Sequence, residues 1–139
     1  MNYIRTTLLV LLAGVLAGCS LTARGPVPVQ VTLSEMKIEL SMTTFEVGVP
    51  YRFIVTNAGK VPHEMMLMPP SMDGKTMSTM PMTQLDTMAL THIHDSDLAP
   101  GANWMVEYTF TRQNAGTLEV ACYLPGHYDA GMYRAISVE

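Results

Sequence analysis

The strongest constraint on the fold is an alternation of apolar and polar residues that recurs along most of the chain. Every second residue is apolar at residues 27–33 and again at residues 36–42. The same period of two returns in the last third of the chain, at residues 104–110 and 118–122. A period of two buries one face of a β-strand, so the pattern predicts about seven short strands separated by Gly, Pro and Asn turns. We therefore expect an all-β sandwich, and no βαβ units or parallel-sheet fold.

The chain opens with a pattern typical of a secretory leader. A short basic start contains Arg5, and residues 8–16 form an apolar run that is too short to span a bilayer comfortably. The sequence Leu16-Ala-Gly-Cys19 then resembles the lipobox of bacterial lipoproteins, which implies cleavage before Cys19 and a diacylated sulfur. An ordinary signal peptide with an incidental cysteine is the alternative. In both cases we expect the mature domain outside the cytoplasm, in the periplasm.

These signals divide the chain into three parts. We expect a lipoprotein signal peptide at residues 1–18, a linker at 19–29 that tethers the protein to a membrane, and one domain at 30–139. A lipid on Cys19 would leave Cys122 unpaired, because the chain has 2 cysteines. An unpaired thiol is unusual in an oxidising compartment, and metal ligation is a reason to keep one.

The charge pattern narrows the class of partner. The chain carries 8 Lys and Arg residues against 12 Asp and Glu residues, a formal net charge of −4. It has no basic stripe, so nucleic-acid binding is not expected. Mild acidity fits a surface that meets a basic protein partner.

One segment near the C-terminus concentrates soft metal ligands. It places Cys122, His127 and Met132 at C-x4-H-x4-M spacing. Pro125-Gly126 and Ala130-Gly131 turn the chain between these residues. Taken singly, a methionine is usually a core residue and a histidine a satisfied polar residue. A thiolate, an imidazole and a thioether on one tight loop, however, are ligand types of a type 1 copper centre, which needs one more histidine.

That second histidine is predicted to be His63, which follows a strand-like run. With it, the chain resembles the cupredoxins, the blue-copper protein family, over residues 29–139. The resemblance rests on the segments around His63, Pro100-Gly101 and Gly116, and on residues 122–132. It implies a Greek-key β-sandwich with copper at one end, bound strongly by two histidines and a cysteine and weakly by an axial methionine. Those ligands would be His63, Cys122, His127 and Met132.

The resemblance also implies how the centre meets its surroundings. His127 would be the ligand nearest solvent, with an apolar rim formed by Leu124, Pro125 and Tyr128. Glu64 follows the first histidine, where small cupredoxins often carry an Asn or Ser that helps to hold the cysteine loop. A carboxylate at that position could change the hydration, potential and colour of the copper, so both a blue and a green site remain open.

A methionine-rich insertion interrupts the strands at residues 69–100. Four of its methionines are candidates for an accessory Cu(I) site, because thioethers are soft ligands: Met72, Met77, Met80 and Met82. Core packing is the alternative for several of the methionines in this part of the chain. Pro81 is expected to begin a short helix that continues to Ala89. His92 and His94 could add a Cu(II) position, although a solvated pair is favoured.

These expectations converge on two functions. The first is a periplasmic electron carrier, cycling between Cu(II) and Cu(I), whose partner is a redox protein such as a c-type cytochrome or an oxidase. The second is copper tolerance or delivery, in which the methionine-rich insertion captures Cu(I) and the partner is a copper-handling protein. An enzyme is not expected, because no coordination position is obviously free for substrate. A metal-free sandwich that binds protein is disfavoured by the ligand loop.

Overall fold

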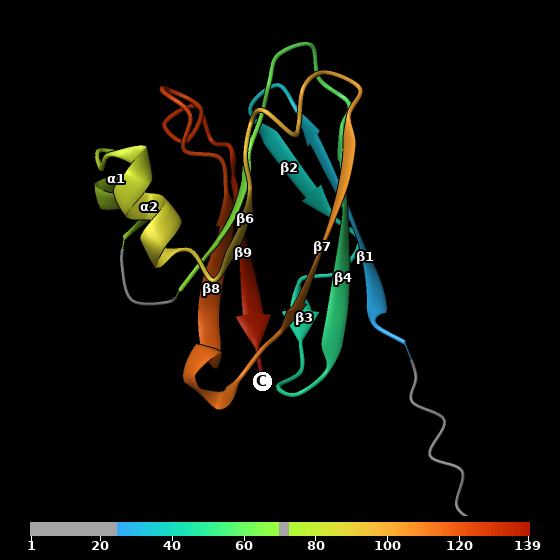
Figure 1. Ribbon diagram of the computed structural model, residues 1–139. Coiled ribbons are helices and arrows are strands. Elements are labelled where there is room, and N and C mark those ends of the chain that lie inside the picture. Colours follow the sequence, from blue (N-terminus) through green and yellow to red (C-terminus); the bar gives the residue numbers. More distant parts are fainter. Residues whose placement is uncertain (1–24, 70–72) are drawn as a thin grey trace, which may run out of the picture.

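The computed structural model describes residues 25–69 and 73–139, which form two β-sheets packed face to face (Figure 1). The first sheet has the strand order β2 (Lys37–Leu40), β1 (Val27–Ser34), β4 (Pro50–Asn57) and β7 (Asn103–Thr109). The second has the order β3 (Thr44–Phe45), β9 (Tyr133–Val138), β8 (Gly116–Ala121), β5 (Met65–Met68) and β6 (Thr91–Ile93). The non-consecutive neighbours are typical of Greek-key connections. The predicted all-β sandwich is confirmed.

Most neighbouring strands are antiparallel, and two pairs are parallel. β1 pairs with β4 in parallel from Val27 opposite Tyr51 to Leu33 opposite Asn57. β3 pairs with β9 in parallel over two residues. These pairs bring segments from the start of the domain beside later ones, so the two sheets are mixed although no βαβ unit is present in the described residues.

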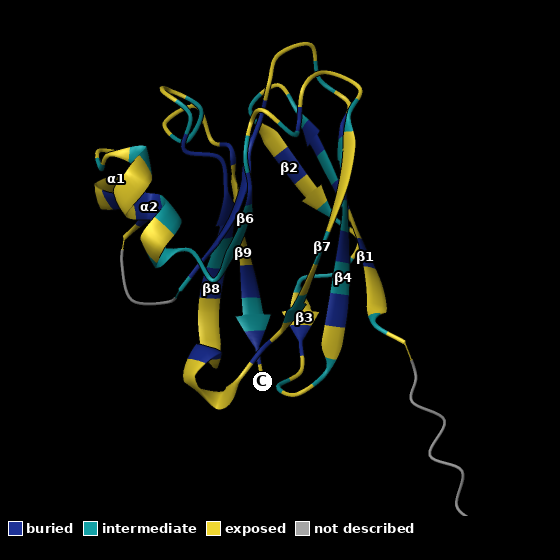
Figure 2. Ribbon diagram, viewed as in Figure 1, coloured by how far each residue is buried: buried dark blue, intermediate teal, exposed yellow. Residues whose placement is uncertain are grey.

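The main core fills the space between the sheets, and the alternation in sequence explains it. Along β4, Tyr51, Phe53 and Val55 are buried, whereas the residues between them are half-buried (Figure 2). Phe45 lies at the centre of an aromatic group, 4.9 Å from Tyr51 and 5.2 Å from Phe110 between ring centroids. Each fully buried aromatic or aliphatic side chain contributes roughly 1.5–3 kcal/mol to folding. This packing makes the sandwich a rigid support for the loops at its ends.

The second sheet is covered on its outer face as well, which the sequence did not indicate. Residues 65–68 are strand-like and all apolar, and we expect such a strand to bury one face, yet all four residues of β5 are buried. The outer face of β5 lies under two short helices, α1 (Gly74–Met77) and α2 (Met82–Met88) (Figure 1). Their contact forms a second apolar cluster made of Met66, Met68, Met77, Leu85, Ala121 and Tyr123.

The two helices begin with different signals. α2 follows Pro81, as predicted, and buries Leu85 against β5. α1 was not predicted; its N-cap is Asp73, whose carboxylate accepts the Thr76 backbone N–H at 3.1 Å. Gly74 is required at the start of α1, because a Cβ at this position would lie 1.8 Å from the Tyr128 hydroxyl. The insertion is therefore a packed cover over the sheet.

Other details differ from the sequence expectations. β1 begins at Val27, so the last three residues of the expected 19–29 linker belong to the sheet. Trp104 shares a face with Val106 and Tyr108 but is 47% exposed, because β7 is the last strand of its sheet.

Residues 1–18, Cys19 and Met72 lie outside the described residues. Within the described residues, no helix is long and apolar enough to cross a membrane.

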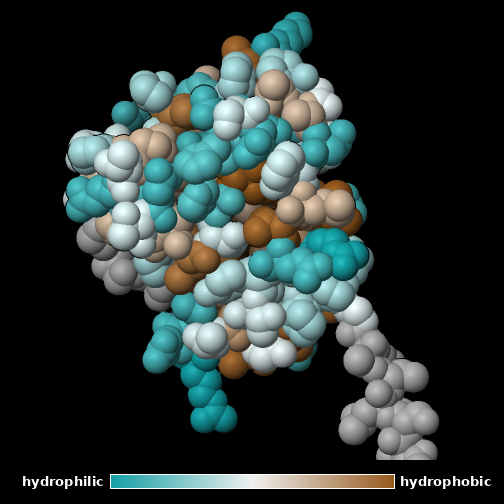
Figure 3. All heavy atoms as spheres, viewed as in Figure 1, coloured by the Kyte–Doolittle hydropathy of each residue, from teal (hydrophilic) through white to brown (hydrophobic). Residues whose placement is uncertain are grey.

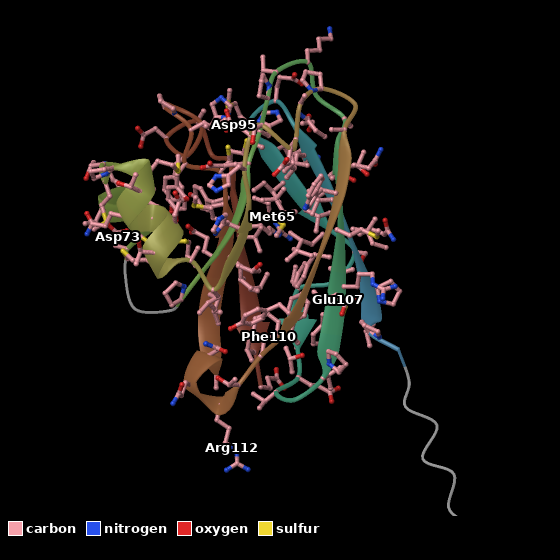
Figure 4. All side chains as sticks on the ribbon, in the orientation of Figure 1. Met65, Asp73, Asp95, Glu107, Phe110 and Arg112 are labelled. Carbon is pink, nitrogen blue, oxygen red and sulfur yellow. The ribbon has the colours of Figure 1, made fainter. Side chains whose placement is uncertain are left out.

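The surface is a mixture of polar and apolar side chains. In the view of Figure 3, apolar side chains gather near the middle of the face, and polar side chains surround them. Figure 4 shows the same division along the chain: Met65 and Phe110 lie between the sheets, whereas Asp73 and Arg112 lie at the periphery. The candidate site is at the end of the sandwich where Asp95 is labelled.

Candidate metal centre

Two loops at the same end of the sandwich carry the predicted ligands (Figure 1). One loop leaves β4 after Asn57 and carries His63 just before β5. The other loop joins β8 to β9 and carries Cys122, His127 and Met132. Because β5 and β8 are neighbouring antiparallel strands, the end of β8 lies beside the start of β5. The sheet therefore brings His63 next to the ligand loop, although the two are at least 59 positions apart in sequence.

The potential ligand atoms of three residues meet at this end. The Cys122 Sγ atom lies 3.3 Å from His127 Nδ1, which lies 3.3 Å from His63 Nδ1. All three ligand atoms are within 4.8 Å of one another. His63 and Cys122 are fully buried, whereas His127 is partly exposed, so His127 is the residue of the three nearest solvent. Two imidazoles and a thiol in this arrangement match the trigonal set of a type 1 copper site.

Met132 is held in the same loop by backbone hydrogen bonds. The Cys122 N–H donates to the Met132 carbonyl at 3.1 Å, and the Met132 N–H donates to the His127 carbonyl at 3.0 Å. The Met132 side chain is buried in the main core together with Cys122. The structure thus brings all four predicted residues to the same end of the sandwich, and Met132 is joined through its backbone to Cys122 and His127.

The loop can close because two glycines adopt a conformation that other residues avoid. Gly126 has φ 80° and Gly131 has φ 99°, in the left-handed region. Between them, the His127 N–H donates to the Leu124 carbonyl at 2.9 Å. These turns fold the loop back so that His127 Nδ1 lies 3.3 Å from Cys122 Sγ. The compact ligand loop predicted from the spacing of these residues is therefore present.

Asn57 orients the loop that carries His63. Its buried amide nitrogen donates to the carbonyls of Val61 at 2.8 Å and Leu98 at 2.7 Å, and its oxygen accepts the Gly59 N–H at 2.9 Å. The Leu98 carbonyl also accepts the His63 N–H at 3.3 Å. No motif in the sequence singled out Asn57, although an Asn shortly before a Gly in a turn is typical of a side chain that bonds to its own loop.

Glu64 connects the two loops. Its carboxylate is buried and accepts the Tyr123 backbone N–H at 2.7 Å, directly after Cys122. Burial raises the pKa of Glu64 to about 7, and the hydrogen bond from Tyr123 opposes that shift. The resemblance to small cupredoxins led us to expect an Asn or Ser in this role. Here a carboxylate forms the connection.

The chemistry of the three facing residues fits a metal ion. Burial raises the pKa of the Cys122 thiol to about 11, so the thiolate needs a compensating cation at neutral pH. Burial and the nearby charge of His127 lower the pKa of His63, which keeps its imidazole neutral, as a metal ligand must be. A free thiol buried against two imidazoles has no packing advantage over an aliphatic residue. A metal ion explains the arrangement.

The methionines proposed for an accessory site have packing partners. Met77 is buried in the second apolar cluster, where the Tyr123 hydroxyl contacts its sulfur at 3.9 Å. Met80 and Met82 are partly buried against the same cluster. Met72 lies outside the described residues. Packing explains the three described methionines, and the accessory Cu(I) site stays a prediction.

Aromatic rings and one carboxylate support the loop from the side of α1. Tyr128 stacks on Tyr123 at 5.1 Å and on Tyr133 at 4.7 Å between ring centroids. The Glu119 carboxylate accepts both hydroxyls, from Tyr123 at 3.1 Å and from Tyr128 at 3.0 Å. Tyr128, expected in the rim around His127, therefore also joins the ligand loop to β8. Leu124 packs against the main core, and Pro125 is exposed.

Solved structures with the same architecture identify the fold. Auracyanin from Roseiflexus castenholzii superposes with a TM-score of 0.68 at 16% identity, covering 83% of this chain and 99% of auracyanin. Rusticyanin from Thiobacillus ferrooxidans superposes with a TM-score of 0.56 at 17% identity, covering 83% of this chain and 79% of rusticyanin. The chain has the cupredoxin fold. The expected resemblance to cupredoxins is confirmed.

Sequence comparison adds relatives that share this cupredoxin-like region. The copper-resistant cuproprotein CopI of Rubrivivax gelatinosus is 31% identical over 116 residues, which cover 79% of this chain and 65% of CopI. The CopI of Pseudomonas aeruginosa is 27% identical over 138 residues, which cover 80% of this chain and 75% of CopI. The match thus spans slightly less than two thirds of the Rubrivivax protein. No protein-family profile matches the sequence.

Proposed function

We propose that this protein binds copper at the cupredoxin-like centre and passes single electrons through it. The observation that carries this proposal is the buried Cys122 thiol 3.3 Å from His127 Nδ1, with His63 Nδ1 a further 3.3 Å away. His63, Cys122 and His127 would bind the ion strongly, and Met132 would be the weak axial ligand. When bound there, copper supplies a Cu(II)/Cu(I) couple that accepts and releases one electron.

The chain's own residues suit that role. Asn57 and Glu64 hold the two ligand loops in fixed positions, so the ligands need little rearrangement when the charge at the centre changes. His127 is the partly exposed ligand, and it provides the route by which an electron would reach a partner. No step in this role makes or breaks a substrate bond, so we do not assign an enzymatic activity.

A role in copper tolerance is the second candidate, and the sequence relatives favour it. Three of them bear the name copper-resistant cuproprotein CopI, at 27–31% identity. The same centre would then bind copper ions as part of tolerance, the methionine-rich insertion would capture Cu(I), and the partner would be a copper-handling protein. The two candidates share the ligand set and differ in what the cell uses it for.

The leader-like start of the chain and the lipobox-like residues 16–19 support a proposal for where the protein acts. We propose that the protein works in the periplasm, tethered to a membrane through a lipid on Cys19. Its redox partner would be a membrane-associated protein such as a c-type cytochrome or an oxidase. The mildly acidic chain supports a partner with a basic surface.

A titration with Cu(II) tests the proposed centre. We expect the first equivalent to give an intense visible absorption from thiolate-to-copper charge transfer, and Cys122→Ser to abolish that band while the far-UV circular dichroism stays the same. Serine has nearly the same size as cysteine but offers no thiolate. A wild-type protein without the band, or a Cys122→Ser variant that keeps it, would rule out the centre.

Two further measurements separate the candidate roles. Rapid oxidation and reduction of the copper-loaded protein by a c-type cytochrome would support electron transfer. Copper sensitivity of a strain that lacks the gene, with normal respiration, would support tolerance. A strain with a respiratory defect and unchanged copper sensitivity would contradict the tolerance role.

A further inference from the structure

A second group of metal-ligating side chains lies on the outer face of the second sheet. It consists of Asp86 on α2, His92 on β6 and His94 directly after β6. One ligand atom from each residue lies within 4.8 Å of the other two. None of these residues belongs to the Cys122 centre, and the proposed function gives them no role.

The fold brings these three residues together for physical reasons. His92 lies opposite Met66 on β5, so its side chain shares the outer face that α2 covers. His94 is two residues further along an extended segment and therefore points to the same side. The two imidazole rings are 4.5 Å apart between centroids. Leu85 anchors α2 to the sheet, and the next residue, Asp86, then faces the imidazoles.

The carboxylate of Asp86 provides a second, independent observation. Its Oδ1 atom is buried and has no hydrogen-bond partner among the described residues. The same atom lies 4.0 Å from His94 Nδ1, which is too long for a hydrogen bond. A buried carboxylate oxygen is costly unless a cation or a donor compensates it. The side chains remain 42% exposed for His94 and 29% exposed for Asp86, so an ion from solvent can reach the group.

We propose that Asp86, His92 and His94 bind a divalent transition-metal ion, separate from the Cys122 centre. Two imidazoles and a carboxylate suit Cu(II) and Zn(II), and Cu(II) binds more tightly in the general order for such ligands. Metal–ligand bonds of about 2.0–2.2 Å bring neighbouring ligand atoms to roughly 2.8–3.6 Å from one another, for angles between 90° and the tetrahedral value. The three ligand atoms already lie within 4.8 Å of one another, and Asp86 Oδ1 is 4.0 Å from His94 Nδ1, so small side-chain rotations achieve that. Water completes the coordination, because the group is open to solvent.

This site goes beyond the proposed function and does not depend on it. It contains no thiolate, so Cu(II) bound there gives no intense charge-transfer band, and its electron paramagnetic resonance signal has the large hyperfine splitting of ordinary nitrogen and oxygen ligands. The two sites are therefore distinguishable in one sample. Both can be followed as Cu(II) is added in steps.

The test is a Cu(II) titration of the tag-free mature protein, followed by visible absorption and electron paramagnetic resonance. We expect one equivalent at the Cys122 centre and a second with the ordinary signal. Asp86→Asn should weaken the second equivalent at least tenfold and leave the first unchanged. The matched control is Asp95→Asn, which removes a nearby exposed carboxylate outside the group and should leave both equivalents unchanged.

A second variant keeps the outcome decisive. His94→Gln should also weaken the second equivalent, while the intact band at the Cys122 centre shows that the variant is folded. Absence of a second equivalent in the wild-type protein overturns the proposal, as does a second equivalent that neither variant weakens. Loss of the band alone would instead contradict the proposed function and leave this site standing.

Discussion

Glu64 occupies the position after the first histidine ligand, where small cupredoxins often carry Asn or Ser. It lies next to His63 and accepts the backbone N–H of Tyr123, so one carboxylate holds the loops of two ligands together. Its burial raises its pKa to about 7, which is the cost of using a carboxylate where an amide or hydroxyl would remain neutral. Asn57 has the matching role on the other side of His63.

We expect Glu64→Ala to destabilise the protein. It leaves the buried Tyr123 N–H without an acceptor, which costs about 1–3 kcal/mol of the free energy of unfolding. Glu64→Gln is the matched control, because its amide oxygen can accept the same hydrogen bond. This variant should lose less unfolding free energy than Glu64→Ala. Urea unfolding of the metal-free variants measures both values. Equal losses would show that the hydrogen bond is not what Glu64 contributes.

The colour of the copper-loaded protein reports on the same residue. Glu64→Asn shortens the side chain and should shift the visible absorption maximum, because the Cys122 loop is no longer held at the same distance. An unchanged spectrum would exclude an influence of Glu64 on the copper centre.

At the scale of elements, the second sheet is the part that connects the site to the rest of the fold. β5 carries core residues on both faces because α1 and α2 cover its outer side. β8 ends at the ligand loop, and Glu119 on β8 accepts hydrogen bonds from two tyrosines of that loop. The helices and the tyrosines thus support the loop from the side away from the main core.

Met77 tests whether the covering helices are structural. Met77→Leu conserves volume and should cost less than about 1.5 kcal/mol of unfolding free energy. Met77→Ala should cost about 2–5 kcal/mol because it leaves a cavity. Urea unfolding measures both. We also expect Met77→Leu to leave the number of bound Cu(I) equivalents unchanged; a reduced number would show that its thioether binds copper.

Glu119 should make the stability of the protein depend on pH. Burial is the main cause that raises its pKa above the ordinary value of 4.5. A raised pKa means that the folded state favours the protonated carboxyl, so its contribution to stability is full below pH 4.5 and is lost as the pH rises through the folded-state pKa. Glu119→Gln removes this titration.

We therefore expect the difference in unfolding free energy between Glu119→Gln and wild type to move in favour of the variant as the pH rises from 4 upward. Urea unfolding of metal-free protein at several pH values measures the difference. A difference that moves in the other direction would show that the hydrogen bonds from Tyr123 and Tyr128 outweigh the effect of burial.

At the scale of the whole molecule, the ligand loops lie at the end of the sandwich opposite the start of β1 (Figure 1). A tether that enters at β1 therefore holds the domain by the end away from the candidate metal centre. Such an arrangement leaves the partly exposed His127 free to meet a partner. The proposed lipid on Cys19 and the proposed electron transfer are compatible for this reason.

Cys19→Ser tests the tether. Without the thiol, no diacyl group can be attached, and we expect the protein to move from the membrane fraction to the soluble periplasmic fraction, because two acyl chains are what make anchoring stable. Cys122→Ser removes the other cysteine and should remain with the membrane. Cell fractionation with detection of the protein measures both. Membrane association that survives Cys19→Ser would disprove the lipid anchor.

The sequence alone indicated most of the strands, the ligand loop and the covering helix at Pro81, but it did not indicate the short strands β3 and β6. These features depend on local chemistry: period-two alternation defines a half-buried strand, glycines at residues 126 and 131 permit the turns, and proline begins a helix. The residue types of His63, Cys122, His127 and Met132 already indicated copper, because their softness does not depend on the fold.

Only the tertiary structure decided which distant groups meet. The bond from Glu64 to Tyr123, the burial of both faces of β5, and the approach of Asp86 to His92 and His94 all join segments whose neighbours in sequence carry no sign of the contact. They arise from strand order and from the way the insertion folds back over the second sheet. Local patterns specify which face of an element is apolar, whereas the packing of the whole chain specifies what that face, and the polar groups beside it, come to touch.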